Sequence, residues 1–251
     1  MFFATVAFIP PLSAQLCLLR VLRVLFPLMN TTPHITLLPG DGIGPEVTAA
    51  AHAVLIEAGL DATCSTHAIG WAEWCERGDP LPSDTLAAVR ASAATLMGAI
   101  TSKPEADALR ELAPRLHGQG LRYRSPIVRL RRELDLYAGL RPARAWPGVP
   151  CAHPDTDILT VRESTEGLYC GIEIDDLDTE RAALIHYDLA TLCESTRGRI
   201  ALSARITTDH ASRRIARVAF EQARLRARAR HTPARVTLLE KPNILRATGS
   251  V

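Results

Sequence analysis

The chain has 251 residues, of which 47% are hydrophobic, and a formal net charge of +2. This length allows one large domain or two modest ones, with ample apolar material for a core. The nearly balanced charge gives no indication of binding to nucleic acid or to an anionic membrane surface. The six cysteines show neither CxxC pairs nor zinc-ligand spacing, so we expect reduced thiols in a cytoplasmic protein.

Residues 1–28 differ in composition from the rest of the chain. They are apolar and carry only Arg20 and Arg23 as charged residues. Pro10 and Pro11 would interrupt a membrane-spanning helix, and the arginines follow the apolar run, whereas a signal peptide has them before it. We therefore predict that residues 1–28 are an upstream start or an appended leader and are dispensable. A targeting peptide and a membrane anchor are the alternatives.

A strand–turn–helix pattern follows this segment. The apolar run His34–Pro39 leads into the glycine turn Gly40–Gly44, and a helical pattern begins at Pro45. Proline is favoured in the first turn of a helix, and the acidic residue after it complements the helix dipole. The pattern predicts that His34–Leu38 is a central strand of a sheet and that a helix over 46–59 packs on it.

The glycine turn also suggests a dinucleotide-binding fingerprint. Its spacing is G-x-G-x-G, whereas the fingerprint is G-x-G-x-x-G, and Pro45 replaces the last stretch. Asp61, about twenty residues further on, could imitate the acid that binds a ribose hydroxyl. From the motif alone, a Rossmann domain is therefore an alternative.

Further elements alternate between helix and strand. The predicted helices are Leu86–Ala91, Leu121–Leu134 and His210–Arg228; the predicted strands are Thr95–Ile100, Ile158–Arg162 and Val236–Leu239. We expect a polar connection over Ile174–Arg181. Such alternation is typical of an α/β fold. We place a first α/β domain over residues 29–137 and a second domain over residues 138–251.

Two segments, Ser125–Pro142 and Val161–Tyr169, carry arginines that suggest a binding site. Guanidinium groups stay charged and bind carboxylates through two parallel hydrogen bonds. Convergence of Arg131, Arg141 and Arg162 would suit a substrate with two or three carboxylates. The alternative is that they are ordinary surface charges, because the chain is rich in arginine throughout.

These segments belong to five ordered blocks that resemble one family, the β-decarboxylating dehydrogenases of isocitrate, homoisocitrate, 3-isopropylmalate and tartrate. The blocks are Ile35–Val47, Gly98–Pro104, Ser125–Pro142, Val161–Tyr169 and Val236–Leu245. The resemblance covers residues 34–251. It implies a two-domain isopropylmalate-dehydrogenase-like fold, not a Rossmann fold, that is incomplete at the C-terminus, with dimerisation and substrate binding in the second domain.

The resemblance implies a role for each matching residue. Ser125 and the three arginines, Arg131, Arg141 and Arg162, would bind substrate carboxylates in one pocket. Tyr169 would donate a proton. The cofactors would be NAD or NADP together with Mg²⁺ or Mn²⁺.

Three more roles follow from the resemblance. Lys241 would be the catalytic base and would reach into the neighbouring subunit's pocket, so a homodimer is expected. Thr101 would contact substrate and nicotinamide, and Asn243 would be the amide on the cofactor side near Lys241. The glycine turn would lie near the nicotinamide end of the cofactor.

The substrate is less clearly indicated. Ser125 stands where isocitrate-type members have a serine, but Ile127 stands where a typical isocitrate enzyme has asparagine. Glu240 and Pro242 are unusual for isopropylmalate enzymes. We expect homoisocitrate or isocitrate as substrate, with 3-isopropylmalate or tartrate as alternatives. The preference between NAD and NADP stays open.

The last matching block lies close to Val251. The family's metal-binding aspartates and adenosine loop have no counterpart in this sequence, and the acidic run Asp175, Asp176 and Asp178 is interpreted as a solvated loop. We therefore expect a fragment of an enzyme, with little or no dehydrogenase activity by itself. The alternative is a non-catalytic remnant or a regulatory partner that binds a polyacid.

Overall fold

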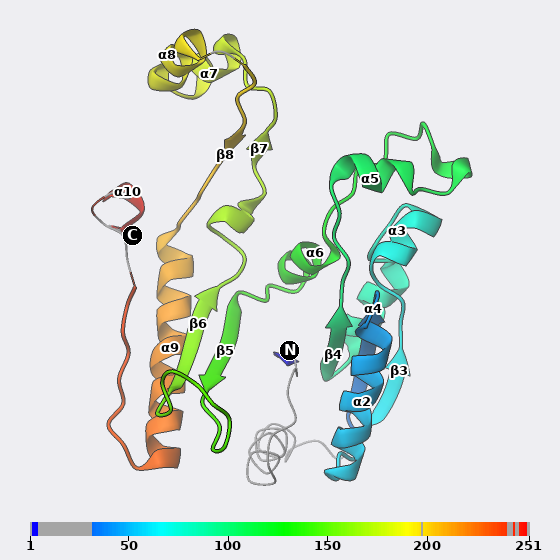
Figure 1. The fold of residues 1–251 in the computed structure, drawn as a ribbon, viewed down its shortest axis with the longest axis vertical. Coiled ribbons are helices and arrows are strands. Elements are labelled where there is room, and N and C mark those ends of the chain that lie inside the picture. Colours follow the sequence, from blue (N-terminus) through cyan, green and yellow to red (C-terminus); the bar gives the residue numbers. More distant parts are fainter. Residues whose placement is uncertain (1, 5–31, 197, 240–242, 244–245, 250–251) are drawn as a thin grey trace. The chain divides into compact units, whose positions relative to one another are not determined.

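The computed structural model describes residues 2–4, 32–196, 198–239, 243 and 246–249. The chain forms two compact units, Met1–Leu136 and Tyr137–Val251 (Figure 1). No helix within the described ranges is long and apolar enough to cross a membrane.

The first unit is built on a four-stranded parallel sheet. Its strands, in spatial order, are β1 (Phe2–Ala4), β4 (Ala94–Ala99), β2 (His34–Gly40) and β3 (Thr63–Thr66). Strand β2 lies inside the sheet between β4 and β3, as predicted. Strand β1 falls in the segment expected to be a leader, and it pairs with β4 from Phe2 opposite Ala94.

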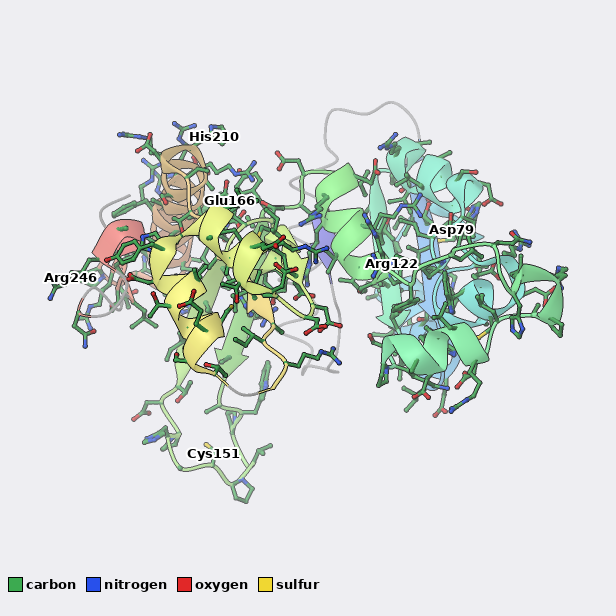
Figure 2. The ribbon with its side chains drawn as sticks, turned by 90° about the horizontal axis from the view of Figure 1, so that it is seen from above. Asp79, Arg122, Cys151, Glu166, His210 and Arg246 are labelled. Carbon is green, nitrogen blue, oxygen red and sulfur yellow. The ribbon has the colours of Figure 1, made fainter. Side chains whose placement is uncertain are left out.

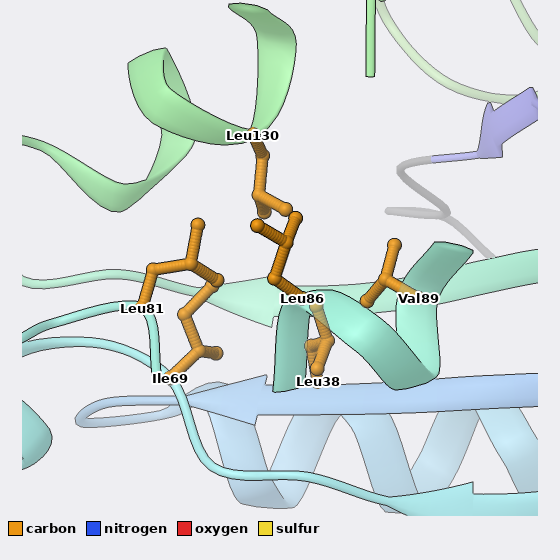
Figure 3. Close-up of a cluster of buried hydrophobic side chains, with 6 residues drawn as sticks. All are labelled: Leu38, Ile69, Leu81, Leu86, Val89 and Leu130. Atoms are coloured by element: carbon orange, nitrogen blue, oxygen red, sulfur yellow. The ribbon is translucent and has the colours of Figure 1, made fainter. Parts of the chain in front are cut away.

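Helices cover both faces of this sheet because the side chains of β2 alternate between them. Ile35 and Leu37 form a core with residues of α2 (Gly44–Glu57), which confirms the helix predicted next to this strand. Leu38 points to the opposite face, into a cluster with residues of α4 (Ser83–Ala91) and α6 (Pro126–Glu133) (Figure 3). The pattern of one strand thus determines a three-layer arrangement.

Helix α6 (Pro126–Glu133) is shorter than the helix predicted over Leu121–Leu134. Proline disfavours helical backbone in the residue before it, and Ser125 has φ −52° and ψ 122°, outside the helical region. The predicted apolar face is confirmed at Leu130, which is buried in the cluster of Figure 3, and at Leu134, which packs against that cluster.

The remaining helices of the first unit gather around two tryptophans. They are α3 (Trp71–Arg77), α5 (Glu105–Arg110) and the short 3-10 helix η1 (Pro114–Leu116). Trp71 and Trp74 of α3 form a buried cluster with Ala108 and Leu112. The indole N–H of Trp74 donates to the carbonyl of Ala108 over 2.8 Å, so this buried polar group has a partner.

The second unit contains an antiparallel pair, β5 (Ala138–Arg144) and β6 (Asp157–Glu163), with the long helix α9 (Asp209–Arg230) alongside β6 (Figure 1). The predictions for the strand Ile158–Arg162 and for the long helix are confirmed. A second pair joins β7 (Glu173–Ile174) and β8 (Leu202–Ser203), with α7 (Thr179–Ile185) and α8 (Tyr187–Ser195) between them in sequence. Helix α10 (Arg246–Gly249) follows later.

Two predictions for the second unit are wrong. The expected polar connection Ile174–Arg181 includes the end of β7 and the start of α7, because Asp178 caps this helix by accepting the N–H of Arg181 over 2.7 Å. The expected strand Val236–Leu239 is not a strand among the described residues. A strand needs a hydrogen-bonded neighbour, and Leu238 and Leu239 are instead highly exposed.

Candidate functional site

Two of the predicted substrate-binding arginines lie on one face of the β5–β6 pair. The register places Arg141 opposite Thr160, and Arg162 opposite Gly139. Directly opposed residues of an antiparallel pair project to the same face, and so do residues two apart on one strand. Arg141 and Arg162 are therefore diagonal neighbours on a single face, and both are exposed. A Cβ on Gly139, opposite Arg162, would lie 2.9 Å from the hydroxyl oxygen of Ser164, so glycine allows this serine to pack closely there.

The opposite face of the pair is occupied by α9. Asp157 forms ion pairs with Arg226, at 2.8 Å, and with Arg230, while Glu163 lies 3.5 Å from Arg214 of the same helix. Since odd-numbered residues of β6 face α9, even-numbered ones, including Arg162, face away from it. Helix packing thus decides which face of the pair is open.

The paired arginines of α9 also alter the electrostatics of Asp157. Partial burial would raise the pKa of this carboxyl, but hydrogen bonds from Arg226 and Arg230 outweigh that effect and hold the pKa below its ordinary value. Arg226 is half-buried, and its Nη2 group donates to both the carbonyl and the carboxylate of Asp157. This arginine therefore joins α9 to β6.

Tyr169 lies next to Arg162. The guanidinium carbon of Arg162 is 5.0 Å from the centroid of the Tyr169 ring, within the range of a cation–π interaction. The tyrosine sits in a short 3-10 helix, η2 (Leu168–Cys170), that follows Gly167. Gly167 has φ +65°, which glycine adopts without strain, and this backbone turns the chain back after β6.

Two glutamates hold the turn between Arg162 and Tyr169. The Glu163 carboxylate accepts the N–H groups of Thr165, over 2.8 Å, and of Glu166, over 2.6 Å, and it also accepts the Thr165 hydroxyl. Thr165 in turn accepts a bond of 2.9 Å from Arg214. The segment that carries Tyr169 is therefore folded by the carboxylate of the last β6 residue.

Glu166 attaches the same turn to α9. It accepts the N–H of Thr208 over 2.9 Å and the Thr208 hydroxyl over 2.7 Å. Thr208 is the N-cap of α9 and itself accepts the N–H of Ala211 over 3.1 Å. In an ordinary capping box an acid three residues into the helix bonds the N-cap N–H. Here Glu166 supplies that bond from a distant segment, near His210 (Figure 2).

Ser125 and Arg131 lie in the first unit, on α6. Ser125 is half-buried at the N-cap position, and its side chain makes no capping hydrogen bond to the described helix. Arg131 is half-buried in the last turn, next to the buried Leu130. The structure brings Arg141, Arg162 and Tyr169 together within the second unit. The single pocket that would also include Ser125 and Arg131 stays a prediction.

Thr101 lies beside the glycine turn. Strands β2 and β4 run parallel as neighbours, and they end at Gly40 and Ala99. The Asp41 N–H donates to the Ala99 carbonyl over 2.7 Å, and the Thr101 N–H donates to the Asp41 carboxylate over 2.9 Å. In open α/β sheets, ligands bind beyond the carboxyl ends of the strands.

The tip of the glycine turn is exposed at this edge of the sheet. Gly42 is exposed, and a Cβ added there would meet no atom within 4 Å. Gly40 and Gly44 are different: a Cβ on either would lie 2.0 Å from a backbone oxygen. These two glycines allow close packing of the turn, and Gly42 leaves free space at its tip.

Side chains on the far side of Thr101 hold the same loop. The Tyr123 hydroxyl donates to the Thr101 carbonyl over 3.3 Å, and burial raises the pKa of this phenol. Lys103 donates to both oxygens of Glu111, at 2.8 and 2.7 Å, and Trp71 donates to one of them over 2.7 Å. These bonds, from Lys103 first, lower the pKa of Glu111.

The remaining expectations for the site concern Asn243, Lys241 and the metal ion. Asn243 lies in an exposed turn, and Lys241 lies outside the described residues. Across the described ranges, no group of three or more histidine, cysteine, aspartate or glutamate side chains could hold a metal ion. Asp175 accepts a bond of 2.9 Å from Arg199. The described acidic residues therefore do not fit Mg²⁺ or Mn²⁺.

Sequence reasoning did not single out Asp41, Glu163 and Glu166. Each carboxylate accepts backbone N–H groups of segments that carry candidate site residues. Their signal in the sequence was an acid inside the glycine turn, and two acids that flank the dipeptide Ser164-Thr165. Without the partners' positions, such acids cannot be told from solvated surface charges.

The comparisons with known proteins show the family and the fold class of the chain. Residues 34–250 match the family model described as isocitrate/isopropylmalate dehydrogenase. The chain belongs to this family. The match includes every block on which the resemblance was based, and the expected fold class is confirmed.

Relatives of the chain include both named activities of the family. It is 36% identical over 217 residues to a 3-isopropylmalate dehydrogenase of Methanothermobacter thermautotrophicus, covering 86% of this chain and 52% of that protein. It is 33% identical to Protein DlpA of Legionella pneumophila, covering 88% of this chain and 34% of that protein. The structure is similar to that of isocitrate dehydrogenase from Methylococcus capsulatus, with a TM-score of 0.66 and 35% identity over 87% of this chain and 54% of that one. The chain spans about half the length of most curated relatives that it matches.

Proposed function

We propose that this chain carries the substrate-binding arginines and the proton donor of a dehydrogenase that oxidises and decarboxylates a 2-hydroxy polycarboxylic acid. The observation that supports this most directly is the arrangement of Arg141, Arg162 and Tyr169 around one open face of the β5–β6 pair. Two exposed guanidinium groups suit a substrate with more than one carboxylate. Family membership supports the same reaction class.

Each residue has a defined task in this proposal. Arg141 and Arg162 bind carboxylates of the substrate, together with Arg131 and Ser125 of the first unit. Lys241 takes the proton of the C2 hydroxyl as a hydride leaves C2, and the carboxylate on C3 then leaves as CO₂. Tyr169 returns a proton to C3. NAD or NADP, when bound, accepts the hydride.

The cofactor would be bound on the first unit. The open tip at Gly42 and the neighbouring Thr101 support a place for the nicotinamide there. Asn243 is proposed as a second contact, near the base. A homodimer is part of the proposal, because in the resembled family the lysine that corresponds to Lys241 enters the partner subunit's pocket.

Two substrate groups remain candidates. Ser125, half-buried at the start of α6, favours homoisocitrate or isocitrate, because a hydroxyl at this position can donate to a distal carboxylate. The names of the relatives favour 3-isopropylmalate instead, since several of them are 3-isopropylmalate dehydrogenases. Tartrate, and a non-catalytic chain that binds a polyacid, are the further alternatives.

The test is calorimetric titration of the full chain with isocitrate, homoisocitrate, 3-isopropylmalate and tartrate. Turnover is assayed in parallel with NAD or NADP in the presence of Mg²⁺. We expect Arg141→Ala and Arg162→Ala to weaken binding of the preferred polyacid at least tenfold, since each removes a charged partner of a carboxylate. The matched control is Arg217→Ala, an exposed arginine of α9, which should leave the affinity unchanged.

The outcomes separate the candidates. Turnover supports the dehydrogenase and contradicts the expectation that the chain is inactive by itself, and the preferred acid decides between the two substrate groups. Binding without turnover is expected both of an enzyme fragment and of the polyacid-binding alternative. Equal loss of affinity in Arg162→Ala and Arg217→Ala, or binding of no polyacid, contradicts the proposal.

A further inference from the structure

The carboxylate of Asp41 accepts three backbone N–H groups from two segments outside its own turn. The N–H of Trp71 donates to Oδ2 over 2.7 Å, and that of Thr101 donates to the same oxygen over 2.9 Å. The N–H of Ala72 donates to Oδ1 over 3.2 Å. Trp71 and Ala72 open helix α3, whose first N–H groups have no partner inside the helix.

The backbone of Asp41 adds the glycine turn to this junction. Its N–H donates to the Ala99 carbonyl over 2.7 Å, and its carbonyl accepts the N–H of Gly44 over 2.8 Å. Asp41 therefore joins three segments: the turn after β2, the loop after β4 that contains Thr101, and the start of α3. Buried or half-buried N–H groups that lose their acceptor destabilise the conformation that places them there.

Gly70, the N-cap of α3, is shaped to this carboxylate. Its φ is +116°, and a Cβ added there would lie 2.3 Å from Oδ2 and 2.7 Å from Cγ of Asp41. Any side chain at this position would push the carboxylate away from its donors. Because Gly70 has no side chain, the Asp41 carboxylate can approach the backbone at the start of α3 closely.

We propose that Asp41 is a positioning residue that holds the backbone of Thr101 in register with the glycine turn. These two segments form the open edge to which we assigned the nicotinamide. The consequence for cofactor binding rests on the proposed function, whereas the effect on Thr101 does not. Asp41 is not proposed to touch substrate or cofactor.

The two bonds shorter than 3 Å both end on Oδ2, and this asymmetry gives a specific test. In Asp41→Asn, the amide carbonyl can take the place of Oδ2 and keep the bonds from Trp71 and Thr101. The amide NH₂ then faces the N–H of Ala72 and cannot accept from it. In Asp41→Ala, all three bonds are lost.

The experiment is amide hydrogen exchange of the full chain, read by NMR at the Trp71, Ala72 and Thr101 amides. We expect Asp41→Ala to accelerate exchange at Thr101 and Trp71 by about tenfold or more, because hydrogen bonds to a charged acceptor are lost. In Asp41→Asn only the Ala72 amide should exchange faster. If Asp41→Ala does not fold, the exchange rates of the three amides in Asp41→Asn still test the positioning role of Asp41.

Asp79→Ala is the matched control. Its carboxylate accepts the N–H of Leu81 over 3.0 Å in the same unit, so its loss destabilises that unit without touching Thr101. Acceleration at Thr101 that is equal in Asp79→Ala and Asp41→Ala, or unchanged exchange in Asp41→Ala, overturns the proposal. NADH titration adds the functional readout: Asp41→Ala should weaken binding about tenfold more than Asp41→Asn.

The two kinds of failure are distinguishable. Wild-type protein that binds no NADH, but shows the expected exchange pattern, contradicts the proposed function and supports the positioning role of Asp41. NADH binding that is equal in all variants, with faster exchange in Asp41→Ala, overturns the link from Thr101 to the cofactor.

Discussion

The guanidinium carbon of Arg162 lies 5.0 Å from the centroid of the Tyr169 ring, although a turn of six residues separates them in sequence. The turn is closed by the carboxylate of Glu163, the neighbour of Arg162 on β6. A candidate carboxylate-binding group and a candidate proton donor are thereby held together by the backbone between them. This relationship allows the observed contact of the Tyr169 ring with Arg162 to be separated from the proton donation that we propose for its hydroxyl.

Tyr169→Phe keeps the ring under Arg162 and removes the hydroxyl. We expect polyacid affinity to stay within about threefold. Any turnover that the wild-type chain shows should fall by about 10²–10⁴-fold, the usual contribution of a positioned general acid. Tyr169→Ala removes both functions and should weaken binding as well. Calorimetry and steady-state assays on the same preparations make the comparison. Equal affinity loss in the two variants would show that the hydroxyl itself binds the substrate.

Glu166→Ala should destabilise the second unit. It leaves the N–H and the hydroxyl of Thr208 without their described acceptor at the start of α9, at a cost of about 1–3 kcal/mol. The measurement is the midpoint of urea unfolding followed by circular dichroism. Glu173→Ala, an exposed acid on β7, is the control and should lie within about 0.5 kcal/mol of wild type. Equal midpoints for Glu166→Ala and the control would contradict the capping role.

Asp157→Asn should make stability less dependent on acid pH. The pKa of Asp157 is lowered in the folded state, so its charge contributes stability above its unfolded-state pKa, and that contribution is lost as pH falls through the folded-state value. At pH 7 we expect the variant to be about 1–2 kcal/mol less stable, with the difference shrinking below a pH of about 4. Thermal unfolding between pH 3 and 7 tests this.

Asp155→Asn is the control for that series. Asp155 is an exposed acid two residues earlier, in the connection before β6, so its removal changes the net charge equally. Parallel stability curves for the two variants would show that the ion pairs of Asp157 with Arg226 and Arg230 contribute nothing specific.

Gly70→Ala should destabilise the first unit by about 2 kcal/mol or more, because a Cβ adds a clash with Asp41 to an unfavourable backbone conformation. Gly118→Ala separates the two effects. Gly118 has φ +76°, but a Cβ there would meet nothing within 4 Å. Thermal unfolding of both variants should show a clearly larger loss for Gly70→Ala. Losses of the same size would mean that the space beside Asp41 is unimportant.

The sequence by itself determined the elements whose signals are local. The apolar run of β2, the proline at the start of α2 and the long helical stretch of α9 each predicted the observed element, since these signals depend on neighbours within a few residues. The family and its candidate site residues also followed from ordered blocks of sequence.

Only the tertiary structure showed which partner each charged side chain contacts. Arg162 and Arg226 are both arginines of an arginine-rich chain, yet Arg162 faces away from α9 and Arg226, on α9 itself, pairs with Asp157. Likewise, Asp41 and Glu166 became recognisable only through N–H groups that lie 30 or more positions away in the chain. The strand expected at Val236–Leu239 differs from the described structure for the same reason. A strand or an ion pair is completed by a partner that is distant in sequence, and its position depends on how the whole unit packs.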